Sequence, residues 1–424
     1  MFKKTTLKNG LRIIAVPMEN TQTVTVLALV GTGSKYEKKE INGISHFLEH
    51  LYFKGTKKRP TNTAVAETLD KVGGIYNAFT AEELTGYFAK VAASQLDIAL
   101  DWVSDIYLNS LLPPAEIEKE RKVLIEEINM YYDTPMIYIG ELWKTLLYGD
   151  QPAGWDIAGT KESVLKIKRE QILNYMNSQY VASNTLVCIA GKISESAIED
   201  KVKDYFSKIK IARAASKEPV VENQKKPAVL VLYKKTDQTH LVLGVRTFYN
   251  LFHPQRYAAE VLGIILGGMM SSRLFDEVRN KLGLAYYVKT DAEADTDTGY
   301  LASVAGIDNS RVETAVSTIL KEYKKISQTK VPETELKKAK DNLRGKLALS
   351  LEPSDAQAFF YGTQELLERK ILTPEEILAK IDKITANDIL KVAKDIFRPE
   401  KLNLALIGPF KDKGKLEKLL NKKP

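Results

Sequence analysis

The pentapeptide His46-Phe47-Leu48-Glu49-His50 contains two of the four histidines in this chain of 424 residues. On a helix, residues four apart lie on one face, so His46 and His50 would present their imidazoles side by side, next to the Glu49 carboxylate. Two nitrogen ligands and a carboxylate that can take a proton from water are typical of a catalytic zinc site. The same residues could also lie idle on a surface helix, so the prediction of a metal site depends on further ligands.

A third protein ligand is required, because catalytic zinc generally uses three and keeps the fourth position for water. The pair Pro113-Pro114 favours a helix start, and the helix that follows is expected to continue to about Tyr132. It places Glu120 and Glu127 two turns apart on one face. These glutamates could complete a metal site, or they could form a solvated acidic stripe that pairs with lysines at helical spacing.

Composition and motifs argue against two kinds of binding site, one for nucleic acid and one for phosphate. The chain has 62 Lys and Arg residues against 54 Asp and Glu residues, and the lysines are scattered instead of clustered with aromatics. No nucleic-acid-binding surface is therefore expected. The Gly267-Gly268 pair is predicted to be a turn and not a phosphate loop, because no Gly-Lys-Ser/Thr follows.

The lone cysteine and the apolar runs bear on location. Cys188 lies in an apolar stretch and cannot form a disulfide within the chain, so we expect a reducing, cytoplasmic setting. The N-terminal residues have no apolar stretch of signal-peptide length, and no apolar run is long enough to span a membrane. We therefore expect no membrane association.

A repeated sequence pattern predicts that the chain has two related halves. The apolar run 186–190 ends at Gly191, and 217 residues later the run 402–407 ends at Gly408, each followed by a lysine-rich helix. One repeated unit of about half the chain is implied. The full length of 424 residues also suits two or more domains.

The break between the halves is predicted in the polar, proline-containing linker 213–227, between an N-terminal domain 1–212 and a C-terminal domain 228–424. Each half mixes strands with helices, so the fold class is α+β. Strands are expected at 11–16, 24–30, 75–80 and 85–91, and helices at 61–71 and 94–110.

Several stretches resemble, in order, the pitrilysin-type (M16) zinc peptidases, which include the mitochondrial processing peptidase. The resemblance covers essentially the whole chain and implies two homologous α/β-roll domains, each a mostly antiparallel sheet packed with helices. The matching stretches are Gly43 to Thr56 around the pentapeptide, Gly73 to Thr80, Glu120 to Glu127, Ser271 to Phe275, Arg279, and Gly283 to Tyr286.

The resemblance also implies roles for the residues. His46, His50 and Glu127 would be the ligands of one zinc ion per chain, and Glu49 would be the general base. Glu120 would be a supporting carboxylate that holds a histidine or the ligand carboxylate in place.

The second half has no equivalent metal motif, because His240 and His253 are thirteen residues apart. By the resemblance it contributes Arg279 and Tyr286, which reach the substrate and can donate hydrogen bonds to a carbonyl or a developing oxyanion. Judged without the resemblance, Arg279 would be a surface arginine and Tyr286 ordinary strand filling. His240 is interpreted as structural.

The stretch Asn77-Ala78-Phe79-Thr80 looks like the family's substrate-binding edge strand, to which an extended peptide adds as one more strand. It could also be a plain edge strand. Main-chain hydrogen bonds along such an edge depend little on the substrate's sequence.

The family's architecture implies a closed chamber of four such domains, of which this chain supplies two. The expected assembly is a homodimer that hydrolyses peptides or unstructured polypeptide segments, because one chain carries both the zinc motif and the Arg279/Tyr286 pair. A heterodimer with a metal-less paralogue and a non-catalytic scaffold subunit are the alternatives.

Overall fold

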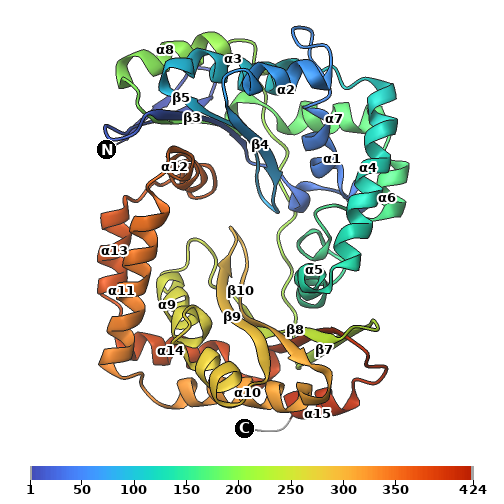
Figure 1. The fold of residues 1–424 in the computed structure, drawn as a ribbon, viewed down its shortest axis with the longest axis vertical. Coiled ribbons are helices and arrows are strands. Elements are labelled where there is room, and N and C mark those ends of the chain that lie inside the picture. The colour runs from blue at the N-terminus through green and yellow to red at the C-terminus, as the bar shows by residue number, and fades with distance from the viewer. Residues whose placement is uncertain (1, 422–424) are drawn as a thin grey trace. The chain divides into compact units, whose positions relative to one another are not determined.

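The chain forms two compact units in the structure, a computed structural model that describes residues 2–421. Each unit is a mixed sheet packed with helices (Figure 1), which confirms the predicted α+β class. Unit 1 comprises Met1–Asn129, Trp155–Glu218 and Ala348–Ile371; unit 2 comprises Met130–Gly154, Pro219–Leu347 and Leu372–Pro424.

Unit 1 contains a six-stranded sheet in the order β1-β2-β6-β3-β5-β4. All neighbouring strands are antiparallel except β2 and β6, which are parallel. The central strands, which are rich in apolar β-branched residues, are buried, and β4 forms one edge of the sheet. The strands are β1 (Lys3–Thr6), β2 (Arg12–Pro17), β3 (Thr23–Val30), β4 (Ile75–Thr80), β5 (Thr85–Ala92) and β6 (Thr185–Gly191).

One face of this sheet packs against helices to form the main core of unit 1, which includes Trp102 and Phe206 as fully buried side chains. Capping explains several helix starts; the Thr61 hydroxyl, for example, accepts from the Ala64 amide at the start of α2. The helices of the unit are α1 (Ile44–Leu51), α2 (Asn62–Asp70), α3 (Leu96–Asn109), α4 (Pro114–Asp133), α6 (Lys161–Lys166), α7 (Arg169–Gln179), α8 (Glu195–Tyr205) and α12 (Ser354–Glu368).

Unit 2 contains a five-stranded sheet in the order β7-β11-β8-β10-β9, in which only β7 and β11 are parallel. The strands are β7 (Ala228–Tyr233), β8 (Gln238–Thr247), β9 (Ala285–Ala294), β10 (Gly299–Asp308) and β11 (Leu402–Gly408). The helices are α5 (Pro135–Tyr148), α9 (Arg256–Gly267), the π-helix η6 (Phe275–Lys281), α10 (Val312–Gln328), α11 (Glu333–Ser350), α13 (Pro374–Asp382), α14 (Ala386–Ile396) and α15 (Gly414–Asn421).

The two sheets repeat one topology. The order β2-β6-β3-β5-β4 in unit 1 matches β7-β11-β8-β10-β9 in unit 2, with the parallel pair at the same place. The echoing apolar runs are β6 and β11, which hold equivalent positions in their sheets. The predicted internal repeat is confirmed.

Each unit also includes one helix from the other half of the chain, a feature that the predicted continuous domains 1–212 and 228–424 do not contain. Helix α12 packs on β3 and β6 of unit 1, and α5 packs on β11 and β8 of unit 2. A Cβ on Gly362 of α12 would lie 2.9 Å from the Leu29 side chain, so glycine permits this close packing. These helices cover the second apolar face of each sheet.

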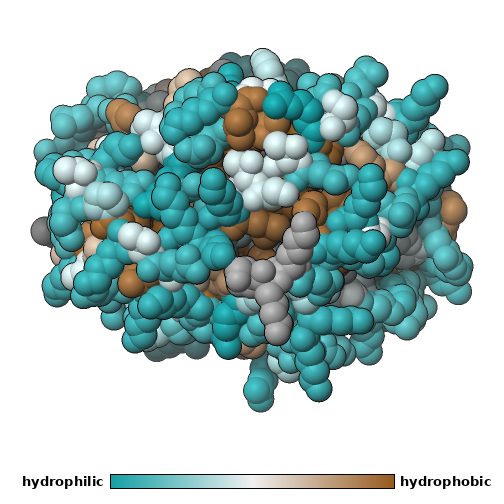
Figure 2. All heavy atoms as spheres, turned by 90° about the horizontal axis from the view of Figure 1, so that it is seen from below, coloured by the Kyte–Doolittle hydropathy of each residue, from teal (hydrophilic) through white to brown (hydrophobic). Residues whose placement is uncertain are grey.

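The face of the molecule seen in Figure 2 is largely polar. Hydrophilic side chains cover most of the face seen in Figure 2, and apolar residues show between them. In the part of the chain that the structure describes, no helix is long and apolar enough to cross a membrane.

Candidate metal centre

Helix α1 carries the pentapeptide and is fixed in the core of unit 1 by its apolar face. Phe47, Leu48 and Leu51 are fully buried there. The helix begins after Gly43, which has a φ of +93° and would bring a Cβ within 2.6 Å of the Ala158 carbonyl oxygen. Glycine is therefore required at this N-cap.

A buried carboxylate holds the N-terminus of α1. Glu37 accepts hydrogen bonds from the amides of Gly43 (2.7 Å) and Ser45 (2.8 Å) and from Asn42 Nδ2 (2.9 Å). Burial raises the pKa of Glu37 to about 7, although these hydrogen bonds act in the opposite direction. The sequence did not predict this role for Glu37. It lies six residues before Gly43 and belongs to no recognisable motif.

The two histidines and Glu127 converge. His46 Nε2 lies 3.1 Å from His50 Nε2, and the two carboxylate oxygens of Glu127 lie 3.8 Å from His46 Nε2 and 3.5 Å from His50 Nε2. One ligand atom from each residue can be chosen so that all three lie within 4.8 Å of one another. Three possible metal-ligand atoms, two from α1 and one from α4, thus lie around a common point.

This donor set fits a zinc ion. With metal–ligand bonds of about 2.0–2.1 Å, tetrahedral geometry separates its ligand atoms by about 3.3 Å, close to the distances observed here. His50 Nδ1 lies 2.9 Å from Glu120 Oε1, and since a carboxylate only accepts, Nδ1 donates and Nε2 keeps a lone pair for a metal. Burial, followed by the charge of His50, lowers the pKa of His46 to about 4, so its imidazole is neutral.

Glu120 is a buried carboxylate that stays ionised. Burial acts to raise its pKa, but the hydrogen bonds from His50 and from Lys54 Nζ, 2.6 Å from Oε2, together lower it. Lys54 follows α1 and was not recognised from the sequence as a site residue. Glu120 therefore accepts from His50 on one oxygen and from Lys54 on the other.

Glu49 lies on α1 between the two histidines, and its side chain is mostly buried. Burial raises the pKa of Glu49, and a hydrogen bond from Thr80 opposes that shift. Thr80 Oγ1 donates to Glu49 Oε2 at 2.5 Å. Thr80 ends β4, so it belongs to the stretch expected to be the substrate-binding edge strand, but nothing in the sequence indicated its contact with Glu49.

Strand β4 is the edge strand of its sheet and pairs with β5. Asn77 is exposed, Ala78 is buried in the core, and Phe79 lies with its ring centroid 5.2 Å from that of Phe359 on α12. The three residues proposed to receive a peptide thus alternate between the two faces of the strand, as a strand requires.

Arg279 and Tyr286 lie together in unit 2. The Arg279 guanidinium is 5.6 Å from the Tyr286 ring centroid and 4.8 Å from that of Phe275, and Tyr286 is 76% exposed. The predicted site residues therefore fall into two groups, one in each unit. His240 Nδ1 lies 2.9 Å from the Tyr287 hydroxyl, a contact that agrees with a structural role.

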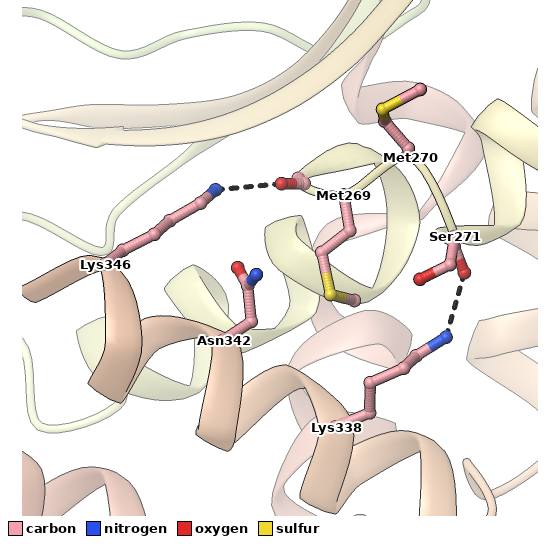
Figure 3. Close-up of a pocket in the computed structure, with 7 residues that line it drawn as sticks. Met269, Met270, Ser271, Lys338, Asn342 and Lys346 are labelled. Atoms are coloured by element: carbon pink, nitrogen blue, oxygen red, sulfur yellow. Dashed lines mark hydrogen bonds between the residues drawn. The ribbon is translucent and has the colours of Figure 1, made fainter. Parts of the chain in front are cut away.

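A pocket of about 620 Å³ in unit 2 surrounds the Gly268 turn (Figure 3). Lys346 and Lys338 on α11 donate to the carbonyls of Gly268 and Ser271, each at 2.9 Å. Gly268 is the C-cap of α9, so Lys346 satisfies a carbonyl at the helix end, while Lys338 holds the turn that follows. The chain turns after Gly267-Gly268, at Met269-Met270, as predicted.

Comparison with known proteins identifies the family. A family model described as "Insulinase (Peptidase family M16)" matches residues 12–161, and one described as "Peptidase M16 inactive domain" matches residues 166–343. The chain belongs to peptidase family M16.

Relatives cover nearly the whole chain. A Bacillus subtilis (strain 168) protein named "Uncharacterized zinc protease YmxG" is 35% identical over 413 residues, which is 96% of this chain and 98% of that protein. A protease structure from Helicobacter pylori superposes with a TM-score of 0.90 at 23% identity, over 96% of this chain and 99% of that one. A Pseudomonas fluorescens structure described as a peptidase M16 inactive domain gives 0.88 at 16% identity, over 97% and 98%. The two structures show the likeness of fold alone.

Proposed function

We propose that this protein is a zinc-dependent endopeptidase that hydrolyses peptides or unstructured polypeptide segments, with one zinc ion per chain. The observation that carries the proposal is the convergence of His46 Nε2, His50 Nε2 and the Glu127 carboxylate beside Glu49. The zinc-protease names of relatives at about a third identity support it.

His46, His50 and Glu127 would hold the ion, and Glu120 would keep His50 in its ligating tautomer. When bound, zinc would supply Lewis acidity that polarises a peptide carbonyl and makes water acidic enough to lose a proton near neutral pH. Glu49 would take that proton as the water attacks the carbonyl carbon. It would then return the proton to the amine nitrogen as the C–N bond breaks.

A substrate would bind as an extra strand along the free edge of β4, at Asn77, Ala78 and Phe79. Arg279 and Tyr286 would donate hydrogen bonds to the substrate, where the developing oxyanion needs them. The working assembly would be a homodimer that encloses the substrate in a chamber. A cytoplasmic location stays a prediction from the lone, buried Cys188.

The test is cleavage of unstructured peptides of graded length by the wild type, by chelated protein and by Glu49→Gln. We expect chelation to abolish cleavage and zinc to restore it. Glu49→Gln should bind zinc normally but lose about 10²- to 10⁴-fold in kcat, the usual contribution of a general base. Glu126→Gln, an exposed glutamate on α4, is the matched control and should cleave normally.

Normal turnover by Glu49→Gln would contradict the proposal. A zinc-loaded wild type that cleaves none of the peptides alone, but cleaves them with a second chain, would favour the heterodimer. Absence of both zinc and cleavage would favour the scaffold subunit.

A further inference from the structure

We propose that Thr80 is a positioning residue that fixes the Glu49 carboxylate for proton transfer and links it to the strand that receives the substrate. The inference rests on the proposed peptidase function and adds to it a residue and a direction of proton movement.

The contact between the two side chains is short and specific. Thr80 Oγ1 donates to Glu49 Oε2 at 2.5 Å, as expected for a hydroxyl that bonds to a charged carboxylate. Among residues 2–421, the bond from Thr80 is the one hydrogen bond that the Glu49 carboxylate accepts. It ends on Oε2, and Glu49 Oε1 takes part in none. Glu49 is only 9% exposed, so solvent does little to orient it.

This contact distinguishes the two oxygens of Glu49. Oε2 is engaged by Thr80, so Oε1 is the oxygen left for the reaction. A water that attacks the substrate carbonyl would pass its proton to Oε1, and the same oxygen would hand it to the amine when the C–N bond breaks. Without the Thr80 hydroxyl, rotation of the carboxylate would move the basic oxygen away from the water.

The backbone of Thr80 is itself held in place. Thr80 is the last residue of β4, and the next residue, Ala81, accepts a hydrogen bond from the Ser34 amide at 3.3 Å. Gly33 packs so closely there that a Cβ would lie 1.9 Å from the Ala81 carbonyl oxygen. The hydroxyl is therefore presented from a fixed point and not from a mobile loop end.

The position of Thr80 in β4 links the base to substrate binding. Side chains alternate along a strand, so Ala78 and Thr80 share the face that packs toward α1, and Ala78 is buried in the same core as Leu48. A peptide that pairs with the outer edge of β4 would bind the strand that carries the hydroxyl. Substrate pairing and base orientation then depend on one element.

The test compares Thr80→Val, which keeps the shape and removes the hydroxyl, with Thr80→Ser, which keeps the hydroxyl. Thr63→Val, at an exposed threonine on α2, is the control. Zinc content, KM and kcat are measured on the same unstructured peptide. We expect Thr80→Val to lower kcat about 10- to 100-fold, with KM and zinc content unchanged, because misorientation of a catalytic group affects the chemical step. Thr80→Ser should restore most of the rate.

A double variant separates positioning from a general structural effect. If Thr80 acts through Glu49, adding Thr80→Val to Glu49→Gln should not lower the residual rate further. An unchanged kcat in Thr80→Val, or a Thr80→Ser variant as slow as Thr80→Val at normal zinc content, would overturn the inference while the peptidase function stands. A zinc-loaded wild type that cleaves nothing would overturn both. If Thr80→Val does not fold, Thr80→Ala against Thr80→Ser gives the same decision.

Discussion

The two units share one sheet topology but differ in what they carry between the antiparallel central strand and the edge strand. In unit 1 the first α-helix of this connection is α1, which presents His46, Glu49 and His50. In unit 2 that first helix is α9, an apolar helix without histidine whose residues are mostly buried. The same frame thus supports a candidate metal centre in one unit and an ordinary core helix in the other.

A second pair of helices repeats the contrast. Helix α4 of unit 1 supplies Glu120 and Glu127 to the histidines, whereas α11 of unit 2 supplies Lys338 and Lys346 to the carbonyls of a turn. A few side chains therefore distinguish a candidate metal centre from a helix that anchors a turn, while the backbone topology stays the same.

The largest expected effect comes from removing a proposed metal ligand of unit 1. Glu127→Ala should abolish both zinc binding and cleavage, because two histidines alone do not complete a catalytic site. The matched change in unit 2 is His240→Ala, which should keep the full zinc content. Metal analysis of both purified proteins checks this, and zinc loss in His240→Ala would break the contrast between the units.

The next largest effect tests whether unit 2 contributes a hydrogen-bond donor to the reaction. Tyr286→Phe removes one proposed donor and should lower kcat/KM by up to about 10²- to 10³-fold without loss of zinc. Tyr233→Phe, at another exposed tyrosine of unit 2, should leave the rate unchanged. Equal rates for both variants would mean that unit 2 supplies no donor through Tyr286.

A smaller effect is expected at the carboxylate behind His50. Glu120→Gln should weaken zinc binding about 10- to 100-fold, because it weakens the hydrogen bond that sets the His50 tautomer. Competition with a chelator of known affinity measures the change. Glu126→Gln lies on the same helix and should bind zinc as the wild type does.

The smallest effect concerns Glu37, which holds the start of α1. Glu37→Gln turns an amide hydrogen toward Gly43 or Ser45 and should lower the free energy of unfolding by about 1–3 kcal/mol. Denaturant unfolding checks this, with the exposed Glu40→Gln as control. Equal stability of the two variants would show that the Glu37 contacts do not hold the helix.

Local patterns predicted much of unit 1. The spacing of His46 and His50 predicted a helix, which is α1 with the candidate metal centre, and the strand expected at 75–80 is β4 with the same bounds. The 217-residue echo revealed the repeat, because β6 and β11 are buried apolar strands with similar flanks.

The features that were missed depend on long-range packing. Helices α5 and α12 cover sheets of the opposite half, and nothing in their own sequences identifies the sheet on which they pack. Glu37 and Lys54 act through contacts to residues that only the tertiary structure brings near, and so does Thr80, which was expected in the edge strand but not beside Glu49. Periodicity reports which face of an element is buried, but not its partner.

The most direct test of the metal centre is the position of zinc in a crystal of the Glu49→Gln protein, measured by anomalous scattering at the zinc absorption edge. We expect one peak per chain in unit 1, bonded to His46 Nε2, His50 Nε2 and the Glu127 carboxylate. A zinc-loaded crystal with no peak at this point, or with its peak in unit 2, would contradict it.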